Sequence, residues 1–353
     1  MTELDLEAHR RELLGYCYRM LGSPFDAEDA VQETLLRAWR NASRFDPARA
    51  PLRGWLFAIA TNVCLDHLRT ARRRARPVDL TGPSAPGAAL GVPYPDPDLV
   101  FPAPDGLVLA PEDLVVRRDT VRLAFIAALQ ALPPRQRSVL ILRDVLAFSA
   151  AEAASLLSTS VAAVNSALQR ARSTLSQPVT AQPIDESLLR RYVEAFTAND
   201  ISALVSVLHE DATMSMPPLP FWLRGRSTLL AAMSASGACA DASLVRCGAS
   251  SFIQYRGGRP FAVVVLEAAP PRFGPSSPSP LPSAAFVPPS PLASASSPPA
   301  PRSSLSAPSG SALAPAGSPL VSPADPMGRI GHITTFLNNP PLLELFARHA
   351  GSH

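Results

Sequence analysis

Arginine and amide side chains gather in residues 51–76, PLRGWLFAIATNVCLDHLRTARRRAR. The polar positions along this segment are Arg53, Asn62, Asp66, Arg69, Arg72, Arg73, Arg74 and Arg76. Guanidinium groups at the end of a packed helix suit the binding of phosphate groups. A core helix with a solvated basic end is the alternative interpretation, and this segment alone does not decide between the two.

Residues 149–175 combine a short helix, a three-residue turn and a longer helix. Ser149 and Glu152 have the spacing of a capping box, which opens the first helix. The longer helix exposes side chains that can bind base edges: Asn165, Ser166, Gln169, Arg170 and Arg172. Arginine and glutamine read guanine and adenine in the major groove, so the pattern predicts a helix-turn-helix. A helical hairpin within a bundle is the alternative, because Ser158 stands where such turns often have glycine.

A third group of reactive side chains lies in the C-terminal third of the chain: His209, Asp211, Tyr255 and His332. Side chains of these types act as general acids and bases in enzyme pockets. Asp211, however, follows an expected helix at a turn, where aspartate favours local hydrogen bonds. A lone histidine on a strand, such as His332, is more often structural. We therefore expect no catalytic residues and no enzyme.

Composition restricts the remaining classes of function. The chain has 353 residues and a net charge of +3, so any nucleic-acid surface must be local. Its basic residues include no lysine. Cys17, Cys64, Cys239 and Cys247 form no metal-ligand cluster, and no metal or cofactor is predicted. The absence of a signal-peptide pattern and of a long apolar run predicts a cytoplasmic protein with no membrane partner.

The elements that would position these residues are mostly helices in the first half. Helices are predicted over 5–21 and from Pro24, with Ser23 as a cap, and over the segment 51–76. Leu52, Trp55, Leu56, Ile59 and Val63 fall at helical spacing and are expected to face the core. Residues 77–111, rich in Pro and Gly, read as a flexible linker, and helices resume at Glu112.

The C-terminal third has a different pattern. Two amphipathic helices are expected over 184–196 and 200–208. Strands follow, with a hairpin that turns at Gly257 and Gly258, a further strand over 328–338 and a last helix. A tract rich in Pro, Ser and Ala, at about 270–326, carries few charges and reads as a disordered insertion between two strands.

With these motifs in view, the first half closely resembles the sigma-70 family, in particular its extracytoplasmic-function (ECF) group. The resemblance rests on AEDAVQETLLRAWR (27–40), PLRGWLFAIATNVCLDHLR (51–69), LPPRQRSVLILRDV (132–145) and SAAEAASLLSTSVAAVNSALQRARSTL (149–175), in that order. It implies two all-α domains: region 2 (5–76), which binds the clamp of core RNA polymerase and opens the −10 element, and region 4 (112–176). Region 4 would contact the polymerase flap and read the −35 element of promoter DNA.

The resemblance also implies roles for single residues. The polymerase-binding face corresponds to Asp29, Gln32, Glu33 and Arg37. The −10 surface corresponds to Arg44, Phe45, Arg53, Asn62, Asp66, Arg69, Arg72 and Arg73, where an aromatic ring and positive charge would hold an unstacked base. The −35 contacts correspond to Asn165, Ser166, Gln169, Arg170 and Arg172, since Ala167 stands where many relatives have arginine.

The C-terminal part, 184–350, resembles the SnoaL-like α+β fold, a cone-shaped barrel, through LLRRYVEAFTANDISALVSVLHEDATMSMPP and RIGHITTFLN. Residues that could line its pocket and hold a small-molecule ligand are Tyr192, Phe196, Trp222, Phe252, Phe261, His332 and Phe336. The sequence as a whole thus predicts a sigma factor with an attached domain that regulates it or senses a ligand. The alternatives are a SnoaL-like enzyme of the cyclase or isomerase type fused to a DNA-binding module, and a repressor that binds DNA without polymerase.

Overall fold

The computed structural model describes most of the chain. The described residues are 5–48, 50–70, 73–95, 98–109, 122–175, 184–236, 241–269 and 329–350. The predicted insertion at 270–326, Arg72 and Cys239 lie outside these residues.

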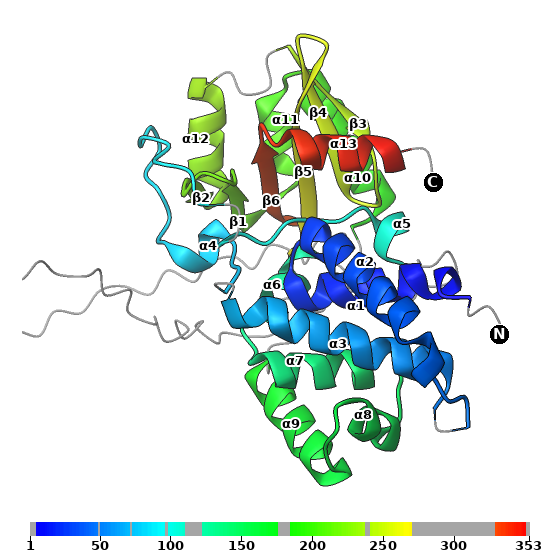
Figure 1. The fold of residues 1–353 in the computed structure, drawn as a ribbon. Coiled ribbons are helices and arrows are strands. Elements are labelled where there is room, and N and C mark those ends of the chain that lie inside the picture. Colours follow the sequence, from blue (N-terminus) through cyan, green and yellow to red (C-terminus); the bar gives the residue numbers. More distant parts are fainter. Residues whose placement is uncertain are drawn as a thin grey trace, which may run out of the picture. The chain divides into compact units, whose positions relative to one another are not determined.

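The chain begins with a bundle of three helices (Figure 1). Its elements are η1 (Glu7–His9), α1 (Arg10–Leu21), α2 (Pro24–Arg40), the short turn η2 (Ala42–Arg44) and α3 (Leu52–Thr70). α1 ends at Gly22, whose φ of +75° is a conformation that favours glycine. Ser23 then caps α2 by accepting a hydrogen bond from the backbone N–H of Asp26 over 3.3 Å. The predicted helices and their cap are confirmed.

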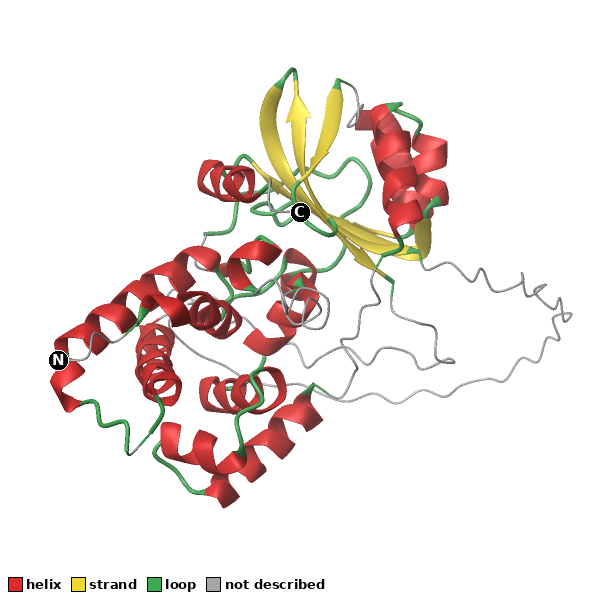
Figure 2. Ribbon diagram, turned by 90° about the vertical axis from the view of Figure 1, so that its right-hand side faces the viewer, coloured by secondary structure: helices red, strands yellow, loops and turns green. Residues whose placement is uncertain are grey.

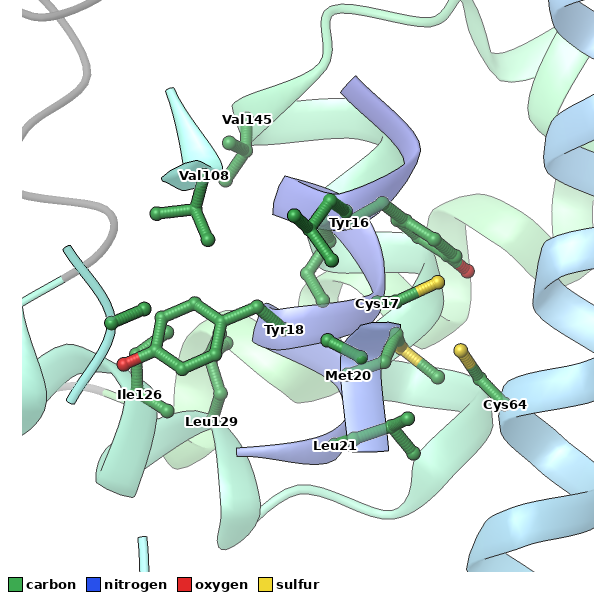
Figure 3. Packing of buried hydrophobic residues seen from close by; sticks show 14 of the residues in the cluster. Tyr16, Cys17, Tyr18, Met20, Leu21, Cys64, Val108, Ile126, Leu129 and Val145 are labelled. Atoms are coloured by element: carbon green, nitrogen blue, oxygen red, sulfur yellow. The ribbon is translucent and has the colours of Figure 1, made fainter. Parts of the chain in front are cut away.

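The buried face of α3 is rotated from the expected one. Leu56 and Phe57 are fully buried, and Tyr16 of α1 meets the Phe57 ring edge-on at 5.3 Å between centroids. Figure 3 shows Tyr16, Cys17 and Cys64 in the same buried cluster. Trp55, which the sequence placed in the core, is only half-buried. Phe57 packs against Tyr16 of α1 and against Phe148, whereas the Trp55 indole lies against Phe45 in the loop before α3.

The described parts of the predicted linker, 77–95 and 98–109, include the short helices α4 (Pro77–Leu80) and α5 (Asp105–Val108). Residues between these helices form hydrogen bonds to other segments of the chain. Phe101 N–H donates to the carbonyl of Gly22 over 3.0 Å, and its own carbonyl accepts from the Tyr18 hydroxyl over 2.9 Å. Tyr94 N–H donates to the Pro218 carbonyl over 2.7 Å. These partners are far away in the sequence, so Pro and Gly content did not indicate them.

A second group of helices follows at residue 123. Its elements are α6 (Leu123–Gln130), α7 (Pro134–Leu140), the π-turn η6 (Ile141–Val145), α8 (Ala150–Leu156) and α9 (Val161–Thr174). The predicted capping box is present: Ser149 Oγ accepts from Glu152 N–H over 3.1 Å, and Ser149 N–H donates to the Glu152 carboxylate over 2.7 Å. The hydrogen bond from the Ser149 side chain lowers the pKa of Glu152. The turn between α8 and α9 passes through Ser158 at φ +50°.

The last part is a mixed sheet with helices. It comprises α10 (Glu186–Thr197), α11 (Ile201–Ser206), β1 (Leu208–Ser215), β2 (Trp222–Arg224), α12 (Arg226–Ser236), β3 (Ala242–Arg246), β4 (Ser251–Arg256), β5 (Arg259–Ala268), β6 (Ile330–Leu337) and α13 (Pro340–His349). The strand order is β2-β1-β6-β5-β4-β3, with β1 and β6 parallel and the other pairs antiparallel.

The predicted closed barrel is wrong, because this is an open twisted sheet (Figure 2). In the described residues β2 pairs only with β1 and β3 only with β4, so both remain edge strands. The expected α+β class and the hairpin are present: Gly257 and Gly258 turn the chain between β4 and β5 with φ of +55° and +74°.

The two faces of the sheet belong to different cores. Helices α10 to α12 cover one face, where Tyr192, Phe196 and Phe252 are buried. On the other face Phe336 packs with α13 and with Phe101, at 5.8 Å between ring centroids. The sheet is therefore covered on both faces.

Candidate nucleic-acid interface

A small cavity lies at the end of α2, beside η2 and the first turns of α3. Its volume is about 290 Å³, and its lining residues are Arg37, Asn41, Arg44, Trp55, Ile59 and Asn62. Two guanidinium groups and two amides thus surround an indole and an aliphatic side chain. Such a lining offers a stacking surface together with hydrogen-bond donors, which is the chemistry that holds an unstacked nucleobase.

The Trp55 indole that lines the cavity contacts a second aromatic ring. Phe45, in the loop before α3, lies 5.1 Å from Trp55 between centroids, with the planes tilted by 38°. The loop therefore positions the indole. Sequence reasoning selected Arg44, Phe45 and Asn62 for this surface but missed Asn41, Trp55 and Ile59. A helical wheel assigns Trp55 and Ile59 to the core because it cannot show that the neighbouring loop leaves a hollow beside them.

Arg37 also lines the cavity, although the sequence assigned it to a polymerase-binding face. Its Nε donates to Oε1 of Glu33 over 2.6 Å, and its Nη1 lies 3.7 Å from Oδ2 of Asp66. The other oxygen of Asp66 accepts from Arg69 Nη1 over 2.9 Å. Asp66, predicted as a DNA-binding residue, is thus a carboxylate between two arginines.

Arg53 lies elsewhere, away from the residues that line the cavity. Its Nε donates to both carboxylate oxygens of Glu12 over 3.0 Å, and Nη2 also bonds to this carboxylate. The guanidinium carbon stands 4.0 Å from the centroid of Phe148, and Nη2 donates to the Leu146 carbonyl over 3.3 Å. These contacts give Arg53 a structural role, joining α1 and α3 to the segment before α8.

The basic tail after α3 divides into exposed and buried arginines. Arg69 and Arg73 are exposed. Arg74 is buried, and it donates to the Leu99 carbonyl over 2.7 Å and to Asp26 over 2.6 Å. Arg76 pairs with Asp79. Of these four arginines, Arg74 and Arg76 thus bind other groups of the same chain.

Helix α9 presents the predicted base-reading residues to solvent. Val164, Leu168 and Ala171 are buried, which leaves the opposite face exposed. The exposed residues on it are Asn165, Ser166, Gln169, Arg170 and Arg172. Ser160 caps the helix by accepting from Ala163 N–H over 3.2 Å. An exposed polar face on the second helix of a capped helix-turn-helix is the arrangement that enters a major groove.

Helix α2 carries a further exposed surface. Asp29 and Gln32 are exposed, as the sequence predicted, and Glu33 is half-buried. Trp39 is 70% exposed and Leu36 is 39% exposed. Sequence reasoning did not select these two apolar residues, although both stand off the buried stripe of the helix, which was the available signal. Large exposed apolar side chains favour a protein partner.

The residues predicted to line a pocket of the sheet domain do not share one site. Tyr192, Phe196 and Phe252 are core residues of one face, and Phe336 belongs to the other. Trp222 donates from Nε1 to the Thr81 carbonyl over 2.9 Å, and Phe261 lies under the guanidinium of Arg256.

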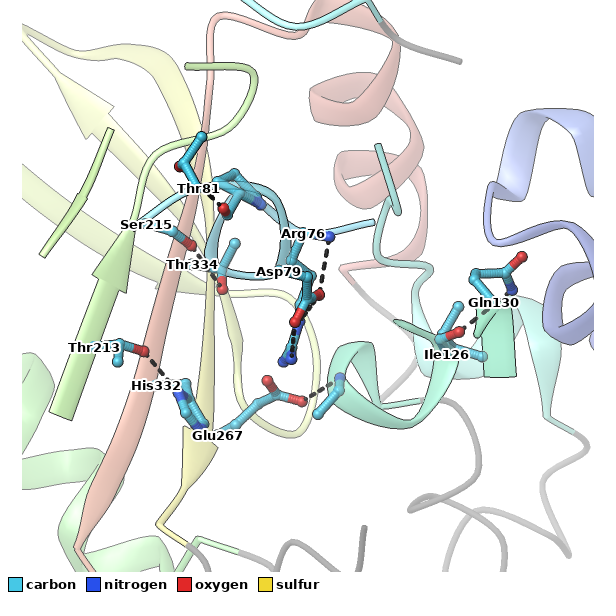
Figure 4. A network of polar contacts seen from close by, with 12 residues as sticks. Arg76, Asp79, Thr81, Ile126, Gln130, Thr213, Ser215, Glu267, His332 and Thr334 are labelled. Carbon is cyan, nitrogen blue, oxygen red and sulfur yellow. Dashed lines mark hydrogen bonds and ion pairs between the residues drawn. The ribbon is translucent and has the colours of Figure 1, made fainter. Parts of the chain in front are cut away.

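His332 occupies a polar cluster on the sheet (Figure 4). Its Nδ1 shares a hydrogen bond of 2.7 Å with the Thr213 hydroxyl. Burial lowers the pKa of His332, against an opposing effect of the Glu267 carboxylate. Glu267 is itself buried and accepts from Ala124 N–H, in the first turn of α6, over 2.9 Å.

Among the other acid and base candidates, the charge of His209 adds to the lowering of the His332 pKa that burial causes. Asp211 N–H donates to His209 Nδ1 over 3.1 Å, and Asp211 pairs at 4.0 Å with Arg224. Tyr255 stands on β4 at the far end of the sheet from this pair.

The described residues include neither a cluster of metal ligands nor a helix that could span a membrane. In the described ranges, no cluster of three His, Cys, Asp or Glu side chains could hold a metal ion. Cys17, Cys64 and Cys247 are buried free thiols. No helix among the described residues has both the length and the apolarity that a bilayer crossing requires.

Two family models match the helical segments. Residues 6–74 match Sigma-70 region 2, and residues 122–175 match Sigma-70, region 4. The expected pair of helical domains, region 2 and region 4, is therefore confirmed.

Curated relatives agree with these matches. The chain is 46% identical over 238 residues to the ECF RNA polymerase sigma factor SigG of Mycobacterium tuberculosis, covering 64% of this chain and 63% of the relative. It is 33% identical over 221 residues to SigJ of the same organism, covering 61% and 64%. The match thus spans less than two thirds of either relative. The crystal structure of M. tuberculosis SigJ is similar at 26% identity and a TM-score of 0.48, covering 75% of this chain and 90% of that one.

Proposed function

We propose that this chain, which carries a region 2 and a region 4 domain of the sigma-70 family, is an ECF sigma factor that directs RNA polymerase to promoters. The observation that supports it most is the presence of both regions in one chain, in family order, each with an exposed surface suited to nucleic acid. A repressor needs a region-4-like reader but has no need of the base-sized cavity beside α3.

Region 2 would bind polymerase and the −10 element on separate surfaces. The exposed face of α2, with Asp29 and Gln32 beside Leu36 and Trp39, suits the clamp, since it offers acidic and apolar contacts together. The cavity that Trp55 and Asn62 line suits one extruded base of the −10 element, and Arg69 and Arg73 suit the flanking phosphates.

Region 4 would read the −35 element through α9. Asn165, Gln169 and Arg170 lie exposed on one helix and can reach base edges. The remainder of this domain would contact the polymerase flap. Since polymerase and promoter DNA are cytoplasmic in bacteria, the proposed site of action is the cytoplasm.

Run-off transcription with core polymerase on a genomic DNA library tests the proposal. We expect promoter-specific transcripts only when the chain is added. The variant Asp29→Ala/Gln32→Ala should weaken co-purification with polymerase and leave folding unchanged, because exposed substitutions typically cost within about 0.5 kcal/mol. A wild-type chain that yields no promoter-dependent transcript would refute sigma activity.

For the sheet domain we propose regulation of the sigma half within the same chain. Three contacts support it: Glu267 accepts from the start of α6, Trp222 donates to Thr81, and the rings of Phe101 and Phe336 are in contact. A ligand or partner that favours one arrangement of these contacts would shift the balance between active and silent forms. A SnoaL-like enzyme remains the alternative for this domain.

The test compares three proteins at equal polymerase occupancy: the full chain, a chain truncated after about residue 176, and Trp222→Phe/Glu267→Ala. Trp222→Phe removes the hydrogen-bond donor to Thr81 and keeps an aromatic ring. We expect truncation to change transcript yield severalfold and the double variant to change it in the same direction. Equal yields from all three, with cell extract supplied as a source of ligand, would exclude the regulatory role.

A further inference from the structure

The cavity beside α3 contains one arginine whose charge is already balanced. Two carboxylates approach the Arg37 guanidinium, Glu33 at 2.6 Å and Asp66 at 3.7 Å. Arg44, which lines the same cavity, has no carboxylate within 4 Å among the described residues. The two arginines therefore offer different chemistry to one ligand.

Helix geometry separates Arg37 from the proposed polymerase face. At 3.6 residues per turn, positions five residues apart point about 140° away from each other. Arg37 therefore diverges from Gln32, whereas Glu33, four residues before it, lies on nearly the same side. That side faces the cavity rather than the exposed apolar surface around Trp39.

We infer that Arg37 reads the base that enters the cavity, and that Glu33 and Asp66 position its guanidinium for this task. This inference rests on the proposed function. A guanidinium whose charge is already balanced by carboxylates binds a phosphate less strongly. Its planar group of N–H donors can still donate two parallel hydrogen bonds to one ligand. Its preferred ligand is therefore an extruded nucleobase with two adjacent acceptor atoms, as guanine has in O6 and N7 and cytosine in O2 and N3.

The hydrogen bonds around Arg37 hold it in place. Its Nε is bound to Glu33, which fixes the plane of the guanidinium, so the terminal nitrogens are the groups that would donate to a ligand, with Nη1 3.7 Å from Oδ2 of Asp66. Asn41 Nδ2 donates to the Arg37 carbonyl over 2.8 Å, so the amide oxygen of Asn41 is the part that can accept from the base. Asp66 adjoins both Arg37 and Arg69 and would repel a phosphate, so we assign it a positioning role through these two arginines.

The experiment uses the full chain with core polymerase and a promoter from the run-off screen. A set of forked promoter DNAs places each of the four bases, unpaired, at one position of the −10 element at a time. The dissociation constant of the polymerase complex is measured for each DNA. At the position that enters the cavity, wild type should prefer guanine or cytosine over adenine and thymine by about 5- to 150-fold. Arg37→Lys keeps the positive charge but cannot donate two parallel hydrogen bonds to one base, so it should reduce this preference to within about twofold.

Two further variants separate the roles. Asp66→Asn should reduce the same base preference while binding duplex DNA at least as tightly as wild type, because it loses a negative charge. Arg40→Ala changes an exposed arginine one turn along α2 that does not line the cavity, and should keep the wild-type preference.

Loss of polymerase affinity in Arg37→Lys with an unchanged base preference would overturn the inference and restore a docking role. An unchanged preference in both the Arg37 and Asp66 variants would overturn it as well. If the proposed function itself is wrong, the wild-type chain will not bind the promoter with polymerase at all, an outcome distinct from an altered base preference in the variants.

Discussion

Arg172 donates two hydrogen bonds to Asp144, from Nε to Oδ2 over 3.0 Å and from Nη2 to Oδ1 over 2.7 Å. This bidentate pair joins the last turn of α9 to the π-turn η6, 28 residues earlier. A phosphate group must therefore compete with Asp144 for this guanidinium, which no spacing rule in the α9 sequence indicates.

The first prediction concerns this competition. Asp144→Asn releases Arg172, so binding to a −35 duplex should tighten and the salt dependence should steepen by about one phosphate contact. The folding free energy should change by less than about 1 kcal/mol, because the pair is exposed. Fluorescence anisotropy at several salt concentrations measures both effects. The double variant Asp144→Asn/Arg172→Ala should lose the gain, and weaker binding of the single variant would contradict the assignment.

The second prediction concerns base reading by α9. Gln169→Ala should change which −35 sequences support transcription, since each bidentate base contact is worth about 1–3 kcal/mol of discrimination. Arg73→Ala, in the tail after α3, should instead weaken all promoters alike and reduce the salt dependence. A promoter-library assay compares the two. An identical sequence preference for wild type and Gln169→Ala would show that this residue does not read bases.

The third prediction tests the turn between α8 and α9. Ser158 adopts φ +50°, which costs a residue with a side chain about 1–2 kcal/mol. Ser158→Gly should therefore raise the free energy of unfolding by about 1 kcal/mol, measured in urea. Ser155→Gly, three residues earlier within α8, is the control and should lower it by about 0.5 kcal/mol, since glycine weakens helices. Equal effects at both sites would mean that the turn is not strained.

The residues of α2 and α3 show what sequence could and could not predict. Helix positions, the Ser23 cap and the exposure of Asp29 followed from local spacing and capping chemistry. The family resemblance placed Arg53 on the −10 surface, and the sequence could not show that Glu12 and Phe148, both distant in sequence, contact it. Arg37 has a similar contact that its own helix does not reveal, because its partner Asp66 lies on another helix. Side-chain pairing between elements decides which arginines remain for a ligand.

The fourth prediction is a pH dependence from His332. Burial lowers its pKa in the folded protein, with Glu267 and Asp79 acting to raise it and Arg76 and His209 to lower it. The unfolded chain therefore binds more protons below the ordinary histidine pKa of about 6.5, and stability should fall as the pH drops through that value. Denaturant titrations between about pH 7.5 and 5.5 measure the slope. His332→Asn should flatten it, and an unchanged slope would assign the dependence to other groups.

The fifth prediction concerns the tract rich in Pro and Ser, which lies outside the described residues. At its borders, Ala269 N–H donates to the Arg329 carbonyl over 2.8 Å, so the two ends meet on neighbouring strands. Shortening residues 275–323 to a few residues should leave the thermal transition of the sheet domain cooperative, because closure cost changes slowly with length. Loss of a cooperative transition would show that the tract contributes to the fold.

The sheet domain shows the limit of motif reasoning at a larger scale. The hairpin at Gly257 and Gly258 was predictable, because two consecutive glycines suit the positive φ angles that such a turn adopts here. The closed barrel was not correct, because closure depends on whether β2 and β3 pair, and neither strand has a signal in its own few residues.

Strand order also has a consequence for the protein during its synthesis. β6 lies between β1 and β5 in the sheet but is the last strand to leave the ribosome. At about 5–20 residues per second, the interval between completion of α9 and of β6 is on the order of 10 s. Through that interval the two helical domains exist on a nascent chain whose sheet still lacks a central strand, so their helices are complete before β1 and β5 can pair with β6.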